Sequence, residues 1–86
     1  MRLDRFLSAA RIFKSRTLAG EAISASMVYV DGVTAKASKE VKPGSIIEID
    51  MLTFYKKIEV REIPSRNLPK SKAHTLYEVL QERAKF

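Results

Sequence analysis

The sequence predicts one α+β domain, in which two N-terminal helices pack on a small antiparallel sheet and a further helix follows at the C-terminus. Three observations support this fold class. Apolar residues near the N-terminus recur with the period of a helix, and those in the middle of the chain alternate with the period of a strand. The dipeptides Asp31-Gly32 and Pro43-Gly44 are typical of turns between strands. Helices followed by a run of strands indicate the α+β class.

Two helices are expected before the strands. The first spans residues 2–13, where apolar side chains recur at three- and four-residue spacing and form one stripe. Ser15 is a suitable N-cap for the second helix, which runs from about Arg16 to Ser24. The second helix is rich in alanine, so we expect it to lie close against the first.

The middle of the chain is expected to form the sheet. The strand segments are Met27–Val30, Val33–Ala37, Ile47–Met51 and about Phe54–Ile63. Ile47 and Ile49 alternate with Glu48 and Asp50, so one face of this strand is expected in the core and the other in solvent.

The last quarter of the chain is expected to lie outside the sheet. Residues 64–72, PSRNLPKSK, contain two prolines and no periodicity, which is typical of a linker. A helix is expected over about Lys72–Lys85, anchored by Leu76, Tyr77 and Leu80. The predicted organisation is therefore a domain over residues 1–63, followed by a linker and C-terminal helix over residues 64–86.

Composition excludes several classes of protein. The 86 residues contain no cysteine and only one histidine, His74, so neither a thiolate site nor the usual zinc ligand set can form. We find no catalytic constellation, and we expect no enzyme activity, metal or cofactor. No apolar run reaches the length of a membrane span, and no signal peptide is evident. The expectation is a cytoplasmic protein without a membrane partner, and a monomer because no heptad pattern occurs.

Positive charge is concentrated near the N-terminus. The net charge is +6, and residues 1–16 hold five basic side chains against one acid. Lys14 and Arg16 stand at a helix start, where the dipole favours anions and cations are mildly destabilising. This placement favours a phosphate-binding surface, to which Ser15 and Thr17 add hydroxyl donors. The alternative is a solvated basic face. The candidate residues are Arg2, Arg5, Arg11, Lys14, Ser15, Arg16, Thr17, Lys36 and Lys39.

Four motifs over residues 1–50 resemble the S4 RNA-binding domain. They are RLDRFL, KSRTLAGEAI, VYVDG and VKPG, in this order. The resemblance implies an S4-like (αL) domain of two helices and a small sheet, and it places Arg2 and residues 14–17 on the RNA-contacting surface. Lys36 and Lys39 would extend that surface, and Asp4 would fix Arg2 or Arg5. Ser26 stands where the family usually has glycine.

The chain length and the final segment look most like the family of ribosome-associated quality-control protein P, which is related to heat shock protein 15. This resemblance implies a non-catalytic protein that binds the large ribosomal subunit, 23S rRNA and peptidyl-tRNA after translation stalls. A partner in that family adds an alanine tail to the nascent chain. Two alternatives stay open. One is an S4-domain factor in ribosome assembly or recycling, and the other is a protein-interaction adaptor whose basic face is incidental.

Overall fold

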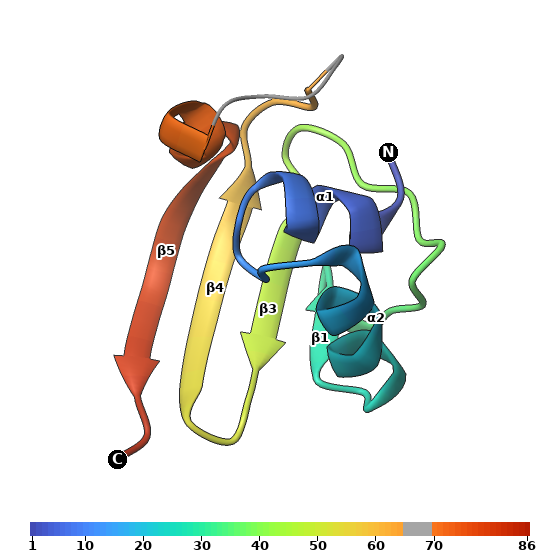
Figure 1. Ribbon diagram of the computed structural model, residues 1–86. Helices are drawn as coiled ribbons and strands as arrows, with labels where there is room; N and C mark the ends of the chain where they lie inside the picture. The colour runs from blue at the N-terminus through green and yellow to red at the C-terminus, as the bar shows by residue number, and fades with distance from the viewer. Residues whose placement is uncertain (65–69) are drawn as a thin grey trace.

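Two α-helices lie on one face of a five-stranded antiparallel sheet (Figure 1). The structure is a computed structural model that describes residues 1–64 and 70–86. The strand order is β2-β1-β3-β4-β5, and every neighbouring pair is antiparallel. The expected α+β class, with two N-terminal helices on an antiparallel sheet, is confirmed.

The helices are α1 (Leu3–Ala9) and α2 (Arg16–Ser24). The predicted cap of α2 is confirmed, because Ser15 Oγ accepts a hydrogen bond from the Leu18 N–H at 3.1 Å. Helix α1 ends four residues earlier than predicted. Its C-terminus is closed by hydrogen bonds from the Arg11 N–H to the Ser8 carbonyl and from the Ile12 N–H to the Leu7 carbonyl.

The strands are β1 (Val28–Val30), β2 (Val33–Thr34), β3 (Ile46–Asp50), β4 (Phe54–Val60) and β5 (Tyr77–Ala84). Between β1 and β2, Asp31 and Gly32 both have positive φ, 51° and 84°, as a type I′ hairpin turn requires. The predicted turn is confirmed, although β2 is shorter than expected. Gly44 also has a positive φ, of 95°, in the turn before β3.

The C-terminal segment differs from the prediction, because it contains no α-helix in the described residues. A 3-10 helix, η1, covers Lys70–Leu76, and β5 then pairs with β4 along its whole length. Leu76 is fully buried as expected, but Leu80 is 45% exposed at a register irregularity and anchors nothing. Pairing with β5 satisfies the backbone N–H and C=O groups of β4. This gain outweighs the helical periodicity of the C-terminal sequence.

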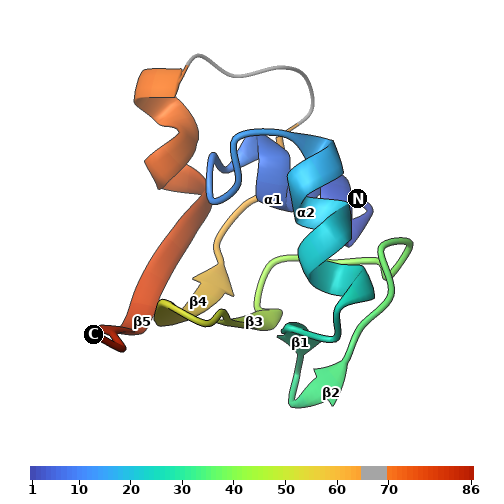
Figure 2. The same ribbon diagram turned by 60° about the horizontal axis from the view of Figure 1, so that its bottom comes forward.

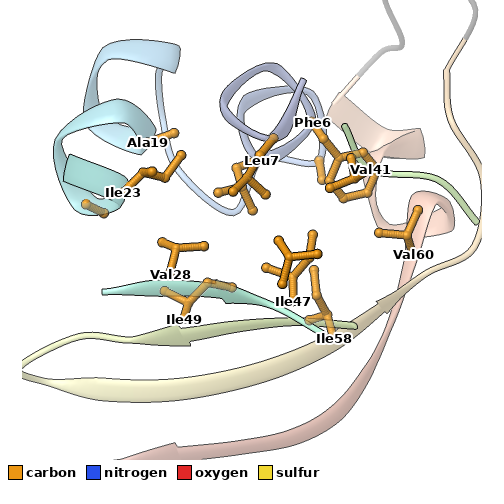
Figure 3. Packing of buried hydrophobic residues seen from close by; sticks show 14 of the residues in the cluster. Phe6, Leu7, Ala19, Ile23, Val28, Val41, Ile47, Ile49, Ile58 and Val60 are labelled. Carbon is orange, nitrogen blue, oxygen red and sulfur yellow. The ribbon is translucent and has the colours of Figure 1, made fainter. Parts of the chain in front are cut away.

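The core lies between the helices and the sheet (Figure 3). Phe6 and Leu7 on α1 and Ile23 on α2 point toward the sheet, and all are at most 4% exposed. The strand side chains that face them are Val28, Ile47, Ile49, Ile58 and Val60. The predicted alternation in β3 is confirmed, since Ile47 and Ile49 are fully buried.

The opposite face of the sheet carries no helix of the described part of the chain (Figure 2). The expected linker at residues 64–72 falls largely on residues 65–69, which lie outside the described ranges, while residues 70–72 begin η1. None of the described helices has both the length and the apolar character needed to cross a lipid bilayer.

Candidate nucleic-acid interface

One buried carboxylate joins the two helices of the candidate surface. Asp4, on α1, accepts hydrogen bonds from Arg2 Nε at 3.2 Å and Arg2 Nη2 at 3.3 Å, and from Arg16 Nε, at the start of α2, at 3.1 Å. The backbone N–H of Arg5 donates to the same carboxylate at 2.8 Å. The side chain of Asp4 is 9% exposed, whereas those of Arg2 and Arg16 are half exposed. We call Asp4, Arg2 and Arg16 the Asp4 clasp.

The clasp keeps Asp4 ionised. Burial by itself would raise the pKa of Asp4, but the hydrogen bonds from Arg16, Arg2 and the Arg5 N–H outweigh burial and lower it below the ordinary value of 3.8. An ionised Asp4 holds both guanidinium groups by their Nε edges. Each guanidinium has five N–H donors, so both retain donors directed elsewhere. Asp4 is expected to fix Arg2 or Arg5, and the structure shows Arg2 as its side-chain partner. Arg16 is a second partner that the sequence did not indicate.

The lowered pKa gives a testable pH dependence. A carboxyl whose pKa is lower in the folded state stabilises the fold above its unfolded pKa, and this stabilisation is lost as the pH falls through the folded pKa. We expect Asp4→Asn to lower the free energy of unfolding at neutral pH by about 1 kcal/mol, because the two arginines are half exposed. Urea unfolding between pH 7 and pH 2 measures this difference. The gap between wild type and variant should close below pH 3.8, and a constant gap would contradict the assignment.

The turn over residues 36–39 covers the start of α1. The N–H groups of Leu3 and Asp4 donate to the carbonyls of Lys39, at 2.8 Å, and Ala37, at 3.3 Å. These bonds bring the Lys36 and Lys39 backbone beside the Asp4 clasp and occupy the first N–H groups of α1. Within the described residues, the Arg16 and Thr17 N–H groups of α2 have no protein acceptor. The start of α2 is therefore the more open of the two helix termini.

Arg11 and Lys14 lie in the connection between α1 and α2, and both are exposed. Arg11 has a φ of 59°, a conformation that costs a residue with a Cβ roughly 1 kcal/mol compared with glycine. The Arg5 side chain is exposed on α1 and forms no ion pair in residues 1–64 and 70–86. The same holds for Arg11, Lys14, Lys36 and Lys39. The structure thus joins Arg2 to Arg16 through Asp4 and brings the 36–39 turn beside them. It shows no direct contact from the Arg5, Arg11 or Lys14 side chains to this group.

Arg11→Gly is expected to change stability and RNA affinity in opposite directions. Removal of the Cβ should stabilise the fold by about 0.5–1.5 kcal/mol, because glycine adopts a positive φ without strain. Loss of the cation should weaken RNA binding severalfold and lower its salt dependence. Thermal unfolding and filter binding at two salt concentrations measure the two effects.

Ser26→Gly is the matched control. Ser26 closes α2 with a φ of 62°, and hydrogen bonds from the Ser26 N–H to Ile23 and from the Met27 N–H to Ala22 repeat the geometry at Arg11. This variant should gain similar stability with unchanged RNA affinity. Equal RNA affinity of both variants and wild type would show that Arg11 is not part of the interface.

Comparisons with known proteins agree with the fold. The S4 domain family matches residues 1–47, more than half of the chain. A Bacillus subtilis protein named RQC P-site tRNA stabilizing factor is 35% identical over 82 residues, which cover 95% of this chain and 94% of the relative. A protein of the same name from Helicobacter pylori is 36% identical over 86% of this chain and 89% of the relative. The structure of heat shock protein 15 from Vibrio cholerae superposes with a TM-score of 0.82 at 32% identity, over 92% of this chain and 80% of that one.

Proposed function

The chain belongs to the S4 domain family, and from this premise we propose that it is a non-catalytic RNA-binding protein of translation quality control. It would bind the large ribosomal subunit through 23S rRNA and the P-site peptidyl-tRNA after translation stalls, and so support alanine tailing of the nascent chain. It would act in the cytoplasm as a monomer. Support comes from relatives named RQC P-site tRNA stabilizing factor that align over nearly the whole chain.

The Asp4 clasp is the observation that carries the proposal. It presents two half-exposed guanidinium groups from the starts of the two helices, beside exposed cations that have no carboxylate partner in the described residues. Such a surface fits the backbone phosphates of structured RNA, which S4-type recognition by shape would use. We assign the phosphate contacts to Arg2, Arg5, Arg11, Lys14, Ser15, Arg16, Thr17, Lys36 and Lys39.

The S4 domain and the name of the Bacillus subtilis relative support a non-catalytic role. No group of three or more metal-ligating side chains occurs in the part of the chain that the structure describes. His74 is exposed on η1. We propose that residues 1–63 form the RNA-binding part, beside which β5 completes the sheet.

Co-sedimentation with large ribosomal subunits tests the function. The protein should pellet with subunits that retain peptidyl-tRNA and bind more weakly to subunits from which it has been removed. Binding should fall steeply between about 50 and 200 mM salt, because phosphate contacts release counterions.

Each other result points to one of the open alternatives. Equal binding to both subunit preparations would contradict the quality-control role and favour a factor in ribosome assembly or recycling. Binding that salt does not weaken would contradict phosphate recognition and favour a protein-interaction adaptor.

A further inference from the structure

A surface cavity of about 450 Å³ lies beside the β1–β2 hairpin. Its lining comes from the hairpin turn, from β2 and from the segment that follows β2. The volume is within the range of about 300–1,000 Å³ that is typical of small-molecule sites. It lies outside the Asp4 clasp, and of the core cluster only Val30 borders it.

The walls of the cavity are aliphatic. Val33 and Ala35 contribute to them, and Val33 is 68% exposed although it is a large apolar residue in a strand. Val30 also borders the cavity, but it is 3% exposed and packs in the core. An exposed valine on a two-residue strand adds little to the core. It gives the cavity an apolar surface against which a flat ring can lie.

Polar groups of two kinds complete the lining. Lys36 and Lys39 are exposed and form no ion pair among residues 1–64 and 70–86, so their ammonium groups are available to an anion. Asp31 accepts the Ile46 N–H at 3.0 Å with Oδ1. Its second carboxylate oxygen remains an acceptor for an amino group.

The cavity borders the candidate RNA surface. The carbonyl of Lys39, which lines the cavity, accepts the Leu3 N–H at the start of α1, next to Asp4. In Figure 2 the segment after β2 rises from the hairpin to the N-terminus beside α1. An RNA strand bound at the Asp4 clasp would therefore lie next to the cavity.

We propose that this cavity receives one unpaired nucleobase of the bound RNA, an inference that rests on the proposed function. The base lies against Val33 and Ala35, its exocyclic amino group meets Asp31, and the flanking phosphates meet Lys36 and Lys39. Proteins read unpaired bases in this way, since a base outside a helix exposes both its face and its pairing edge. A phosphate alone would leave the aliphatic walls unused, and an apolar peptide would leave both lysines unpaired.

Two RNA duplexes test the proposal. Both contain the same single unpaired nucleotide position in one strand, which is an adenosine in the first duplex and an abasic residue in the second. Wild type should bind the adenosine duplex about fivefold more tightly, the lower end of the effects seen for a stacked base. Ser38 also lines the cavity, so Ser38→Leu adds bulk to it without a change in charge. It should remove this preference and leave the affinity for the abasic duplex unchanged.

Ser24→Leu, the same change at an exposed position of α2 outside the cavity, should keep the preference. Val33→Ser, which removes an exposed wall, serves if Ser38→Leu does not fold, and it should reduce the preference. Equal binding of both duplexes by wild type would overturn the cavity inference and leave RNA binding intact. Retention of the preference in a folded Ser38→Leu would also overturn it. Failure of wild type to bind either duplex would contradict the proposed function as well.

Discussion

Arg16→Ala is expected to weaken binding to the large ribosomal subunit by about tenfold to a hundredfold. The guanidinium of Arg16 donates to Asp4 and is half exposed, so its other donors are available to RNA. A hydrogen bond to a charged partner contributes about 1.5–3 kcal/mol, which corresponds to this loss. Co-sedimentation at fixed salt measures it.

The fold should survive this substitution. Asp4 keeps Arg2 and the Arg5 N–H as partners, so the free energy of unfolding should fall by no more than about 1 kcal/mol. The matched control is Arg83→Ala, which removes one cation from the other face of the sheet. The guanidinium of Arg83 stacks on Tyr55, 4.8 Å from the ring centre. Tyr55 is three positions before the inward-facing Ile58 in β4, and because side chains alternate along a strand, it lies on the outer face of the sheet. Equal loss of binding in both variants would show that Arg16 contributes only through the net charge of the protein and not through a specific contact.

Leu76→Ala is expected to lower the free energy of unfolding by about 2–5 kcal/mol. Leu76 is fully buried between η1 and β5, and its carbonyl accepts the N–H groups of Arg61 at 2.8 Å and Glu62 at 3.3 Å. Truncation would leave a cavity where the C-terminal segment joins the core. For a domain of this size, such a loss is a large share of the total stability. Urea unfolding followed by circular dichroism measures it.

Leu80→Ala distinguishes the observed strand from the predicted helix. In the helix, Leu80 would lie one turn from Leu76 and anchor it equally. In the structure Leu80 is 45% exposed at the register irregularity between β4 and β5, so its truncation should change stability by less than about 1 kcal/mol. Comparable destabilisation by both substitutions would contradict the β4–β5 pairing.

Local patterns predicted most of the fold. The Ser15 cap, the Asp31-Gly32 turn and the buried Ile47 and Ile49 each depend on neighbours in sequence, and the structure confirms all of them. The prediction for the C-terminal segment was wrong because the periodicity of its sequence fits a helix. Its structure depends instead on pairing with β4, which is distant in sequence. Cross-strand pairs such as Lys56–Glu82 favour the strand, but they are visible only once β4 and β5 are aligned.

The candidate site was predictable in composition but not in geometry. The clustered charge identified the basic residues as candidates, and the family resemblance indicated which of them lie on the RNA-contacting surface. The contact of Asp4 with Arg16 spans twelve positions and depends on how α1 packs against α2. The positive φ of Arg11 follows from the early end of α1, which the apolar stripe through Phe13 concealed. The cavity beside the hairpin arises from the path of the chain after β2, for which no local pattern exists.

The Asp4 clasp also changes what RNA binding requires of the side chains. A free arginine samples many rotamers, and its immobilisation at an interface costs about 0.5–1.5 kcal/mol in conformational entropy. Asp4 already restricts the rotamers of Arg2 and Arg16 in the free protein, so less conformational entropy is lost when RNA binds. A carboxylate that repels phosphate can therefore increase affinity for RNA wherever the complex uses the rotamers that it fixes.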